Sequence, residues 1–254
     1  MVPGPLRRPV PASGRSFLES RWHASRAAFV ECFLSDARRG ACGGVRCEVL
    51  FVDEFLATFD FSDEIQTVVA ADTATTWRAL MDADLIEVGR QRPLVALLGA
   101  ARILPELVWQ RLHGEHPPAA PARLILRDTT KLPMSEGGWV LLGERPQEEI
   151  AFGLVGKFWR PVIQFAEVDA AAFKDFAEPG FAKTVYALGT RRLDDEKTLL
   201  WAIMRTATTD EQARTWFRRY WTFGVGYGAH VLVHGLLDLV HQEAERTRGT
   251  SASG

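Results

Sequence analysis

The chain has 254 residues, a formal net charge of −2, and 47% hydrophobic against 24% charged residues. This composition is typical of a globular protein with one large domain and room for an extension. A nearly neutral charge argues against a nucleic-acid binder, because phosphate contacts need a strong basic surplus.

We expect residues 1–47 to form an extension that is partly disordered, since its first 15 positions are rich in Pro, Gly and Arg. Apolar residues at helical spacing predict a short amphipathic helix from Ser16 to Leu34. The cysteines form no CxxC pair, so we expect free thiols in a reducing cytoplasm; they are Cys32, Cys42 and Cys47. No apolar stretch of signal-peptide length follows the start. We therefore predict a cytoplasmic protein.

The domain itself is expected to span residues 48–248, with a disordered tail at 249–254. It begins with an extended lead-in at Cys47–Val52 and a strand at Phe59–Val69, in which Ile65, Thr67 and Val69 alternate with a wetter face. Two helices follow. The first runs to Met81 after a cap at Asp72 or Thr73, and the second follows Pro93 and should bend or divide at Pro105.

Short strands separated by turns come next, which is the spacing of a meander. They are expected at Arg123–Arg127, Trp139–Gly143, Glu149–Val155, Pro161–Val168, Ala182–Arg191 and Thr198–Thr206, with a short helix at Asp169–Phe176. Sequential antiparallel strands with helices gathered at the ends predict an α+β fold.

A run without proline from Thr209 to Arg248 predicts one long helix. Its aromatic and polar stripe consists of Trp216, Tyr220, Phe223, Tyr227, His230, His234, Leu237 and His241. We expect this stripe to close a curved antiparallel sheet over a largely apolar cavity. Glycines at 224, 228 and 235 share another stripe, where they would allow either a close approach or a local kink.

Residues 222–240 approach the length of a membrane span, but two histidines, Asp238 and four glycines favour a buried helix, so we expect no membrane insertion. This helix is apolar nearly all round and should be covered on more than one side. The cover would be the early helices, the segment around Trp22 and Phe29, or a second protomer in a homodimer.

Four strings resemble uncharacterised bacterial members of the SRPBCC superfamily, the START-like proteins that include polyketide cyclase/dehydrase-like members. They are Val140–Glu144 (VLLGE), Gly153–Pro161 (GLVGKFWRP), Phe176–Lys183 (FAEPGFAK) and Phe217–Trp221 (FRRYW). The resemblance implies a helix-grip fold, a curved antiparallel sheet wrapped around the C-terminal helix with a hydrophobic pocket between them. One departure is Ile203, which stands where similar sequences often carry a carboxylate two positions before an Arg.

His230 and His234 lie four residues apart on one helical face, which suits a metal, but the pattern HVLVH lacks the glutamate of a metalloprotease helix. We predict no metal and no cofactor. The predicted ligand-binding residues are Trp159, Tyr186, Trp201, Arg205, Tyr220, Phe223, Tyr227 and His230. A mostly apolar wall with a few polar tips is the usual lining of a small-molecule site.

The leading hypothesis is therefore a protein that binds an apolar small molecule or lipid-like ligand in an internal cavity. One alternative is a cyclase or dehydratase that uses Tyr227, His230 or Arg205 as polar catalysts. The other is a protein-interaction module whose apolar C-terminal helix forms an interface.

Overall fold

The computed structural model describes residues 49–114, 123–131 and 139–251. The expected extension at 1–47 lies outside these residues. The strands are β1 (Phe61–Val69), β2 (Val140–Arg145), β3 (Glu149–Lys157), β4 (Gln164–Phe165), β5 (Ala182–Arg192) and β6 (Thr198–Thr208). The helices are α2 (Phe51–Phe55), α3 (Thr73–Met81), α4 (Leu85–Gln91), α5 (Pro93–Leu112), α6 (Ala170–Phe173), α7 (Glu211–Tyr220) and α8 (Gly226–Ser251), with a 3-10 turn η1 (Leu126–Lys131) and a π-helical turn η3 (Trp221–Val225).

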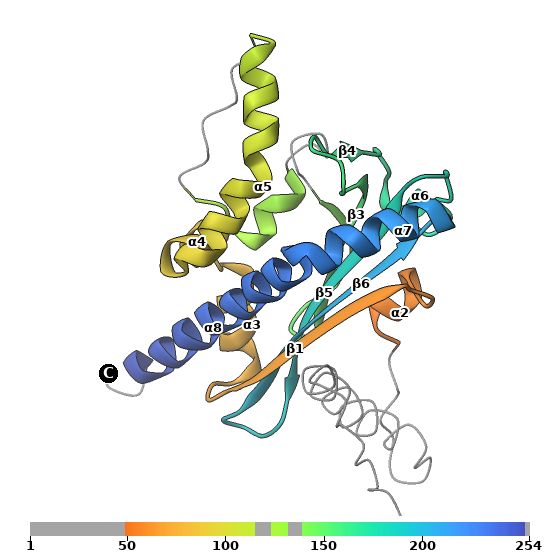
Figure 1. The fold of residues 1–254 in the computed structure, drawn as a ribbon. Coiled ribbons are helices and arrows are strands. Elements are labelled where there is room, and N and C mark those ends of the chain that lie inside the picture. The colour runs from red at the N-terminus through yellow and green to blue at the C-terminus, as the bar shows by residue number, and fades with distance from the viewer. Residues whose placement is uncertain (1–48, 115–122, 132–138, 252–254) are drawn as a thin grey trace, which may run out of the picture. The chain divides into compact units, whose positions relative to one another are not determined.

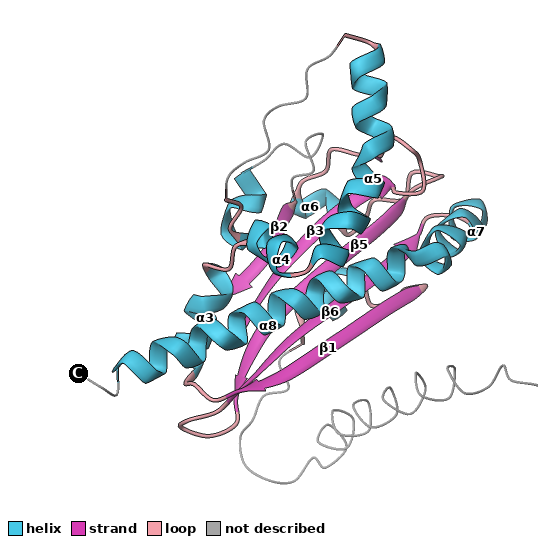
Figure 2. Cartoon of the chain, turned by 60° about the vertical axis from the view of Figure 1, so that its left-hand side comes forward, coloured by secondary structure: helices cyan, strands magenta, loops and turns pink. Residues whose placement is uncertain are grey.

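The strands form one curved six-stranded sheet in the order β1-β6-β5-β3-β2, with β4 paired to β3. Every pairing is antiparallel, and β5 and β6 form a long hairpin from Ala182 paired with Thr208 to Arg192 paired with Thr198. Figure 2 shows α8 running along one face of this sheet. The predicted α+β, helix-grip class is confirmed.

The inner face of the sheet, which α8 and α3 cover, carries the main core. Leu237, Val240 and Ala244 of α8 are almost fully buried there with Leu80 of α3 and Leu200 of β6. Full burial of one such aliphatic side chain contributes roughly 1.5–3 kcal/mol. The C-terminal half of α8 is therefore held firmly on the sheet.

The outer face of the sheet is covered by α2 and α6. Val52 of α2 and Phe173 of α6 are fully buried against Ala151, Val155 and Val185 of the strands. This layer was not expected, because the sequence pattern of Cys47–Val52 was interpreted as an extended lead-in. The sheet thus has helices on both faces.

Two predicted strands were wrong, and one helix was missed. Arg123–Arg127 makes only an isolated bridge between Ile125 and Asp84, followed by η1, and Pro161–Val168 contributes only the two residues of β4. Helix α4 was not predicted. The reason lies in Asp84, whose carboxylate accepts hydrogen bonds from the backbone N–H groups of Ile86 and Leu124 at 3.0 Å each, so that it caps α4 and holds the later segment. Helix α5 is not divided at Pro105.

The C-terminal helical run is bent by 63° between its α7 and α8 parts. The π-helical turn η3 lies at the bend, and Trp221 packs so closely over Gly226 that a Cβ there would lie 2.6 Å from the indole. A wider π turn displaces the face that follows it relative to a regular helix. The helix also continues to Ser251, past the expected domain end at Arg248.

Within the described part of the chain, no individual helix combines the length and apolarity of a membrane span. Helices Glu211–Phe223 and Gly226–Thr250 meet that requirement only when the bent pair is taken together.

Glu149, at the start of β3, anchors α2 to the sheet. The backbone N–H of Phe51 donates to both carboxylate oxygens of Glu149, at 2.9 and 3.1 Å, and Arg145 Nη1 donates to Oε2 at 3.0 Å. The side chain of Glu149 is only 1% exposed. Burial raises the pKa of Glu149 to about 7, although the Phe51 hydrogen bond and the Arg145 charge oppose this rise and the nearby Asp53 adds to it.

Glu149 is expected to make the folded protein less stable as the pH rises from about 5 to 7.5. Because its folded pKa lies above the ordinary value of 4.5, its favourable contribution is full below pH 4.5 and is lost as the pH rises through about 7, with an upper bound of roughly 3 kcal/mol. Urea unfolding of the Glu149→Gln variant across this range should show a flatter pH dependence. The exposed neighbour Glu148 supplies the control, since Glu148→Gln should keep the slope of the parent protein.

Candidate functional site

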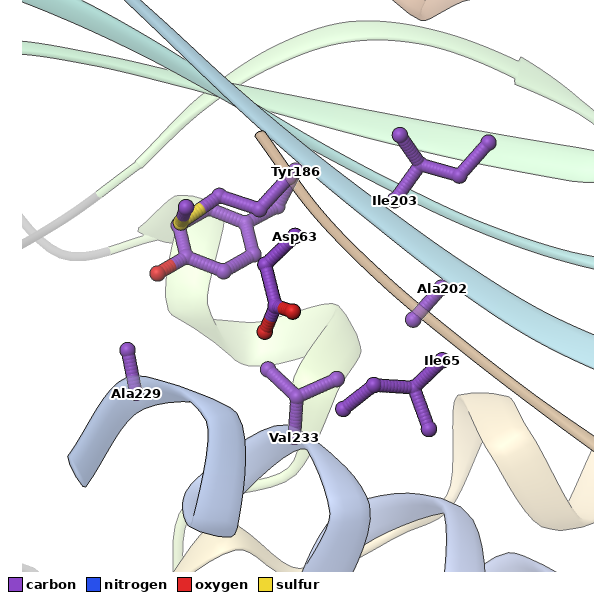
Figure 3. A pocket seen from close by; sticks show the side chains of 8 residues that line it. Asp63, Ile65, Tyr186, Ala202, Ile203, Ala229 and Val233 are labelled. Atoms are coloured by element: carbon purple, nitrogen blue, oxygen red, sulfur yellow. The ribbon is translucent and has the colours of Figure 1, made fainter. Parts of the chain in front are cut away.

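The inner face of the sheet carries two polar side chains in one row that crosses four strands. The strand register places Phe152 of β3 beside Tyr186 of β5, Tyr186 beside Met204 of β6, and Met204 beside Asp63 of β1. Figure 3 shows Asp63 and Tyr186 on the side of the sheet that faces α8. An apolar row therefore carries a carboxylate and a phenol beneath the helix.

Asp63 is joined to His230 of α8. His230 Nδ1 lies 2.9 Å from Oδ2 and 3.1 Å from Oδ1 of Asp63, and the two side chains are 33% and 10% exposed. Because an ionised carboxylate only accepts, the imidazole donates through Nδ1, and this fixes the tautomer of the neutral ring with the lone pair on Nε2. A carboxylate that orients an imidazole in this way is the arrangement used for general acid–base chemistry.

Tyr186 lies in the same region and stays protonated. Burial raises the pKa of Tyr186 well above its ordinary range, and the charges of Tyr220 and Asp63 raise it further. Its ring meets Trp139 edge to face, with centroids 5.0 Å apart. A neutral phenol held by packing can donate a hydrogen bond to an oxygen of a bound molecule.

A small cavity of about 10 Å³ lies between the sheet and α8 at this point. Its lining residues, whose side chains Figure 3 shows, are Asp63, Ile65, Tyr186, Ala202, Ile203, Met204, Ala229 and Val233. A void of this size holds about one water molecule, whereas drug-sized ligands need roughly 300 Å³ or more. A largely apolar cavity between sheet and helix was expected from the sequence, and at this position the cavity is too small for such a ligand.

Two of the predicted ligand-binding residues lie at this cavity. Tyr186 is on the cavity wall, and His230 is paired with Asp63, which also lines the cavity. Tyr220 and Trp159 both pack in another cluster, around Phe158 and Phe217, although Tyr220 is near enough to Tyr186 to influence its pKa. Binding by any of these residues remains a prediction.

Trp201 and Arg205 were expected in the same site but lie on the outer face of the sheet. Arg205 Nη1 donates to Asp53 of α2 at 2.6 Å, and its guanidinium stacks over Phe59 with 4.5 Å to the ring centroid. Trp201 packs over Gly189 of the neighbouring strand. The sequence did not show that a helix covers this face.

Phe223 and Tyr227 were also expected to line the cavity, and the structure exposes 85% and 61% of these residues. The physical reason is the π-helical turn at the bend, which shifts the helical phase. After the bend, the side of α8 that packs in the main core carries Val233, Leu236, Leu237, Val240 and Ala244, and of these only Leu237 belongs to the predicted stripe.

Asp63 is the principal residue that the sequence interpretation missed. It lies in phase with Ile65 and Val69, the inward positions of β1, so an acidic residue on the apolar face of a strand was the available signal. Pairing it with a histidine 167 positions away required the fold.

The other C-terminal histidines contact separate carboxylates. His234 Nδ1 lies 3.1 Å from Asp238, which also pairs with Arg92, and His241 Nε2 lies 3.0 Å from Glu245. In the described residues, no three His, Cys, Asp or Glu side chains are grouped in a way that could hold a metal ion.

Comparison with known proteins gives low similarity throughout. No family model matches the sequence, and no curated protein matches it significantly. Among solved structures, a conserved protein from Geobacillus kaustophilus is 10% identical over 74% of this chain and 97% of its own, with a TM-score of 0.34. The Zhui aromatase/cyclase from Streptomyces sp. R1128 is 15% identical over 73% of this chain and 94% of its own, with a TM-score of 0.26. A hypothetical protein from Helicobacter pylori is 8% identical over 78% and 98%, with a TM-score of 0.32.

On the outer face of the sheet, Trp201 packs so closely on Gly189 that a larger residue at position 189 should destabilise the protein. A Cβ at residue 189 would lie 2.2 Å from Trp201 and 2.4 Å from the carbonyl oxygen of Glu148, and a backbone oxygen cannot move aside as a flexible side chain can. We expect Gly189→Ala to lower the free energy of unfolding by about 1–3 kcal/mol in urea titrations. Gly249→Ala, which meets nothing within 4 Å, should not destabilise the protein.

Proposed function

We propose that this domain is a START-like, SRPBCC-type protein that binds a small, mostly apolar molecule with one polar group between the inner face of the sheet and α8. The observation that carries the proposal is the pairing of Asp63 with His230 beside Tyr186, in a wall otherwise made of aliphatic side chains. Such a wall supplies apolar contact, while the polar groups orient the ligand.

The chemistry of these polar groups selects for a ligand that carries an oxygen. Tyr186 is a neutral donor, and the imidazole of His230 either donates or accepts through Nε2 according to its protonation. A hydroxyl or carbonyl group can form hydrogen bonds with these polar groups, which a pure hydrocarbon cannot do.

Binding requires the N-terminal half of α8 to move away from the sheet, because the present cavity holds about one water molecule. The bend at η3 gives this motion a place to occur, and residues Leu237, Val240 and Ala244 hold the other half of the helix. Opening of this kind is a hinge motion about a few terminal residues of an element.

Filling the cavity should block binding. Val233 lines the cavity, and Val231, two residues away on α8, points to the other side of the helix. We expect Val233→Phe to weaken binding of 1-naphthol at least 10-fold in isothermal titration calorimetry, and Val231→Phe to leave it unchanged. Thermal unfolding of both variants verifies that each is folded. Equal binding by all three proteins, or by none, would contradict the proposal.

A second candidate function is catalysis of the cyclase or dehydratase type, and the same pair favours it. The imidazole that the carboxylate orients can take a proton from the substrate carbon beside the carbonyl group, while the neutral phenol on the same wall donates to the carbonyl oxygen. The protonated imidazole then returns this proton to the β-hydroxyl group, so that the Cβ–O bond breaks, water leaves and the conjugated double bond forms.

The test is the Asp63→Asn variant, since the amide oxygen can still accept from Nδ1 but no longer stabilises a protonated imidazole. With a short β-hydroxyacyl thioester as the probe, formation of the conjugated product should fall by roughly 10²-fold or more in this variant, while binding changes little. Absence of any product with the parent protein would leave binding as the function and reject catalysis on this substrate class.

A further inference from the structure

Helix α5 presents an unusual apolar surface. Leu97, Leu104, Val108 and Leu112 are exposed by 65%, 57%, 50% and 78%. Both views show α5 standing away from the sheet, with its first turns near α4 and α8 (Figure 1, Figure 2). Exposed apolar side chains that are scattered singly need no explanation, but a continuous stripe of them marks an interaction surface.

The stripe has the spacing of a coiled-coil seam. Leu97, Ala101, Leu104 and Val108 are separated by four, three and four residues, so they follow one edge of the helix. All four are exposed. Over this stretch, the seam contains no charged residue, and Arg111 comes at the next position of the same spacing.

The seam is complementary to itself when two copies of the helix run antiparallel. Pairing Ala101 of one copy with Leu104 of the other also brings Leu97 opposite Val108, so that a larger side chain meets a smaller one at each level. Large and small residues facing each other are how two helices interdigitate without voids. An isologous contact of this kind closes after two copies.

We propose that α5 is a dimerisation helix, and that the partner covering its exposed seam (Leu97, Ala101, Leu104 and Val108) is the seam of a second copy of this chain. A membrane surface fits less well, because helices that lie on membranes carry several cations beside their apolar face. The charged residues of α5 are two arginines, Arg102 and Arg111, and one glutamate, Glu106, so the helix has a net charge of only +1. The proposal concerns a surface separate from the cavity and does not depend on the proposed function.

The test is the mass of the full chain in solution across a concentration series, by sedimentation equilibrium. We expect a concentration-dependent dimer. We expect Leu104→Gln to weaken dimerisation at least 10-fold, because each of the two copies then places a polar amide in the centre of the seam. Glutamine keeps a high helix propensity, so the helix itself should persist.

Trp109→Gln is the matched control. Trp109 is 55% exposed on the same helix but points away from the seam and stacks on His113, so its loss removes more apolar surface without touching the proposed contact. The dimer should survive this change.

Three outcomes would overturn the proposal. The first is a parent protein that is monomeric at all concentrations. The second is equal weakening by Leu104→Gln and Trp109→Gln, which indicates nonspecific apolar association. The third is a monomer that floats with phosphatidylcholine–phosphatidylglycerol vesicles and loses this property in Leu104→Gln, which assigns the seam to a lipid surface.

Discussion

The packing of the C-terminal half of α8 on the inner face of the sheet determines where every candidate functional group lies. Leu237, Val240 and Ala244 are exposed by 1% or less, so the axis and rotation of the helix are fixed there. At Gly235, close contact brings Val88 within 2.8 Å and Arg92 within 2.9 Å of where a Cβ would stand, and this holds α4 against the same helix. The phase set by these contacts then places Val233 and Ala229 over the cavity and His230 over Asp63.

The rotation of α8 gives different partners to His230 and His234, although these two histidines lie only four residues apart. His230 contacts a carboxylate on β1, which is only 10% exposed, while His234 contacts Asp238 of its own helix, where the ion pair with Arg92 also lies. A pair between neighbouring turns of one helix contributes a few tenths of a kcal/mol and orients little else. The contact between His230 and Asp63 joins the helix to the sheet and so positions the imidazole relative to Tyr186. For this reason the proposed function rests on His230 and not on His234.

The sequence predicted what depends on local periodicity and failed where a distant contact decides. The alternation of Ile65 and Val69 in β1 and the cap at Asp72, which accepts from Thr75 N at 2.9 Å, follow from neighbouring residues and were predicted correctly. Helix α2 was missed because Glu149, which holds its first N–H group, lies 98 positions away. The rotation of α8 was missed because one π-helical turn changes the phase of all later residues, while a count of heptads assumes a uniform helix.

For the proposed ligand binding, the same bend offers a way for a domain that is closed in this structure to open. The part of α8 between Gly226 and Val233 contacts the sheet through the small side chains of Ala229 and Val233 and through the hydrogen bonds between His230 and Asp63. The part from Leu236 onward is packed by larger aliphatic side chains. Local opening costs least where few buried apolar contacts are lost. In the proposed binding, an apolar ligand beneath the first two turns of α8 would replace the contacts of Ala229 and Val233 with its own, so the cost of opening that remains includes the hydrogen bonds between His230 and Asp63. A ligand oxygen that forms a hydrogen bond with His230 or Tyr186 would offset this cost of opening. We therefore expect the polar group of the ligand to affect the affinity more than the size of the ligand does.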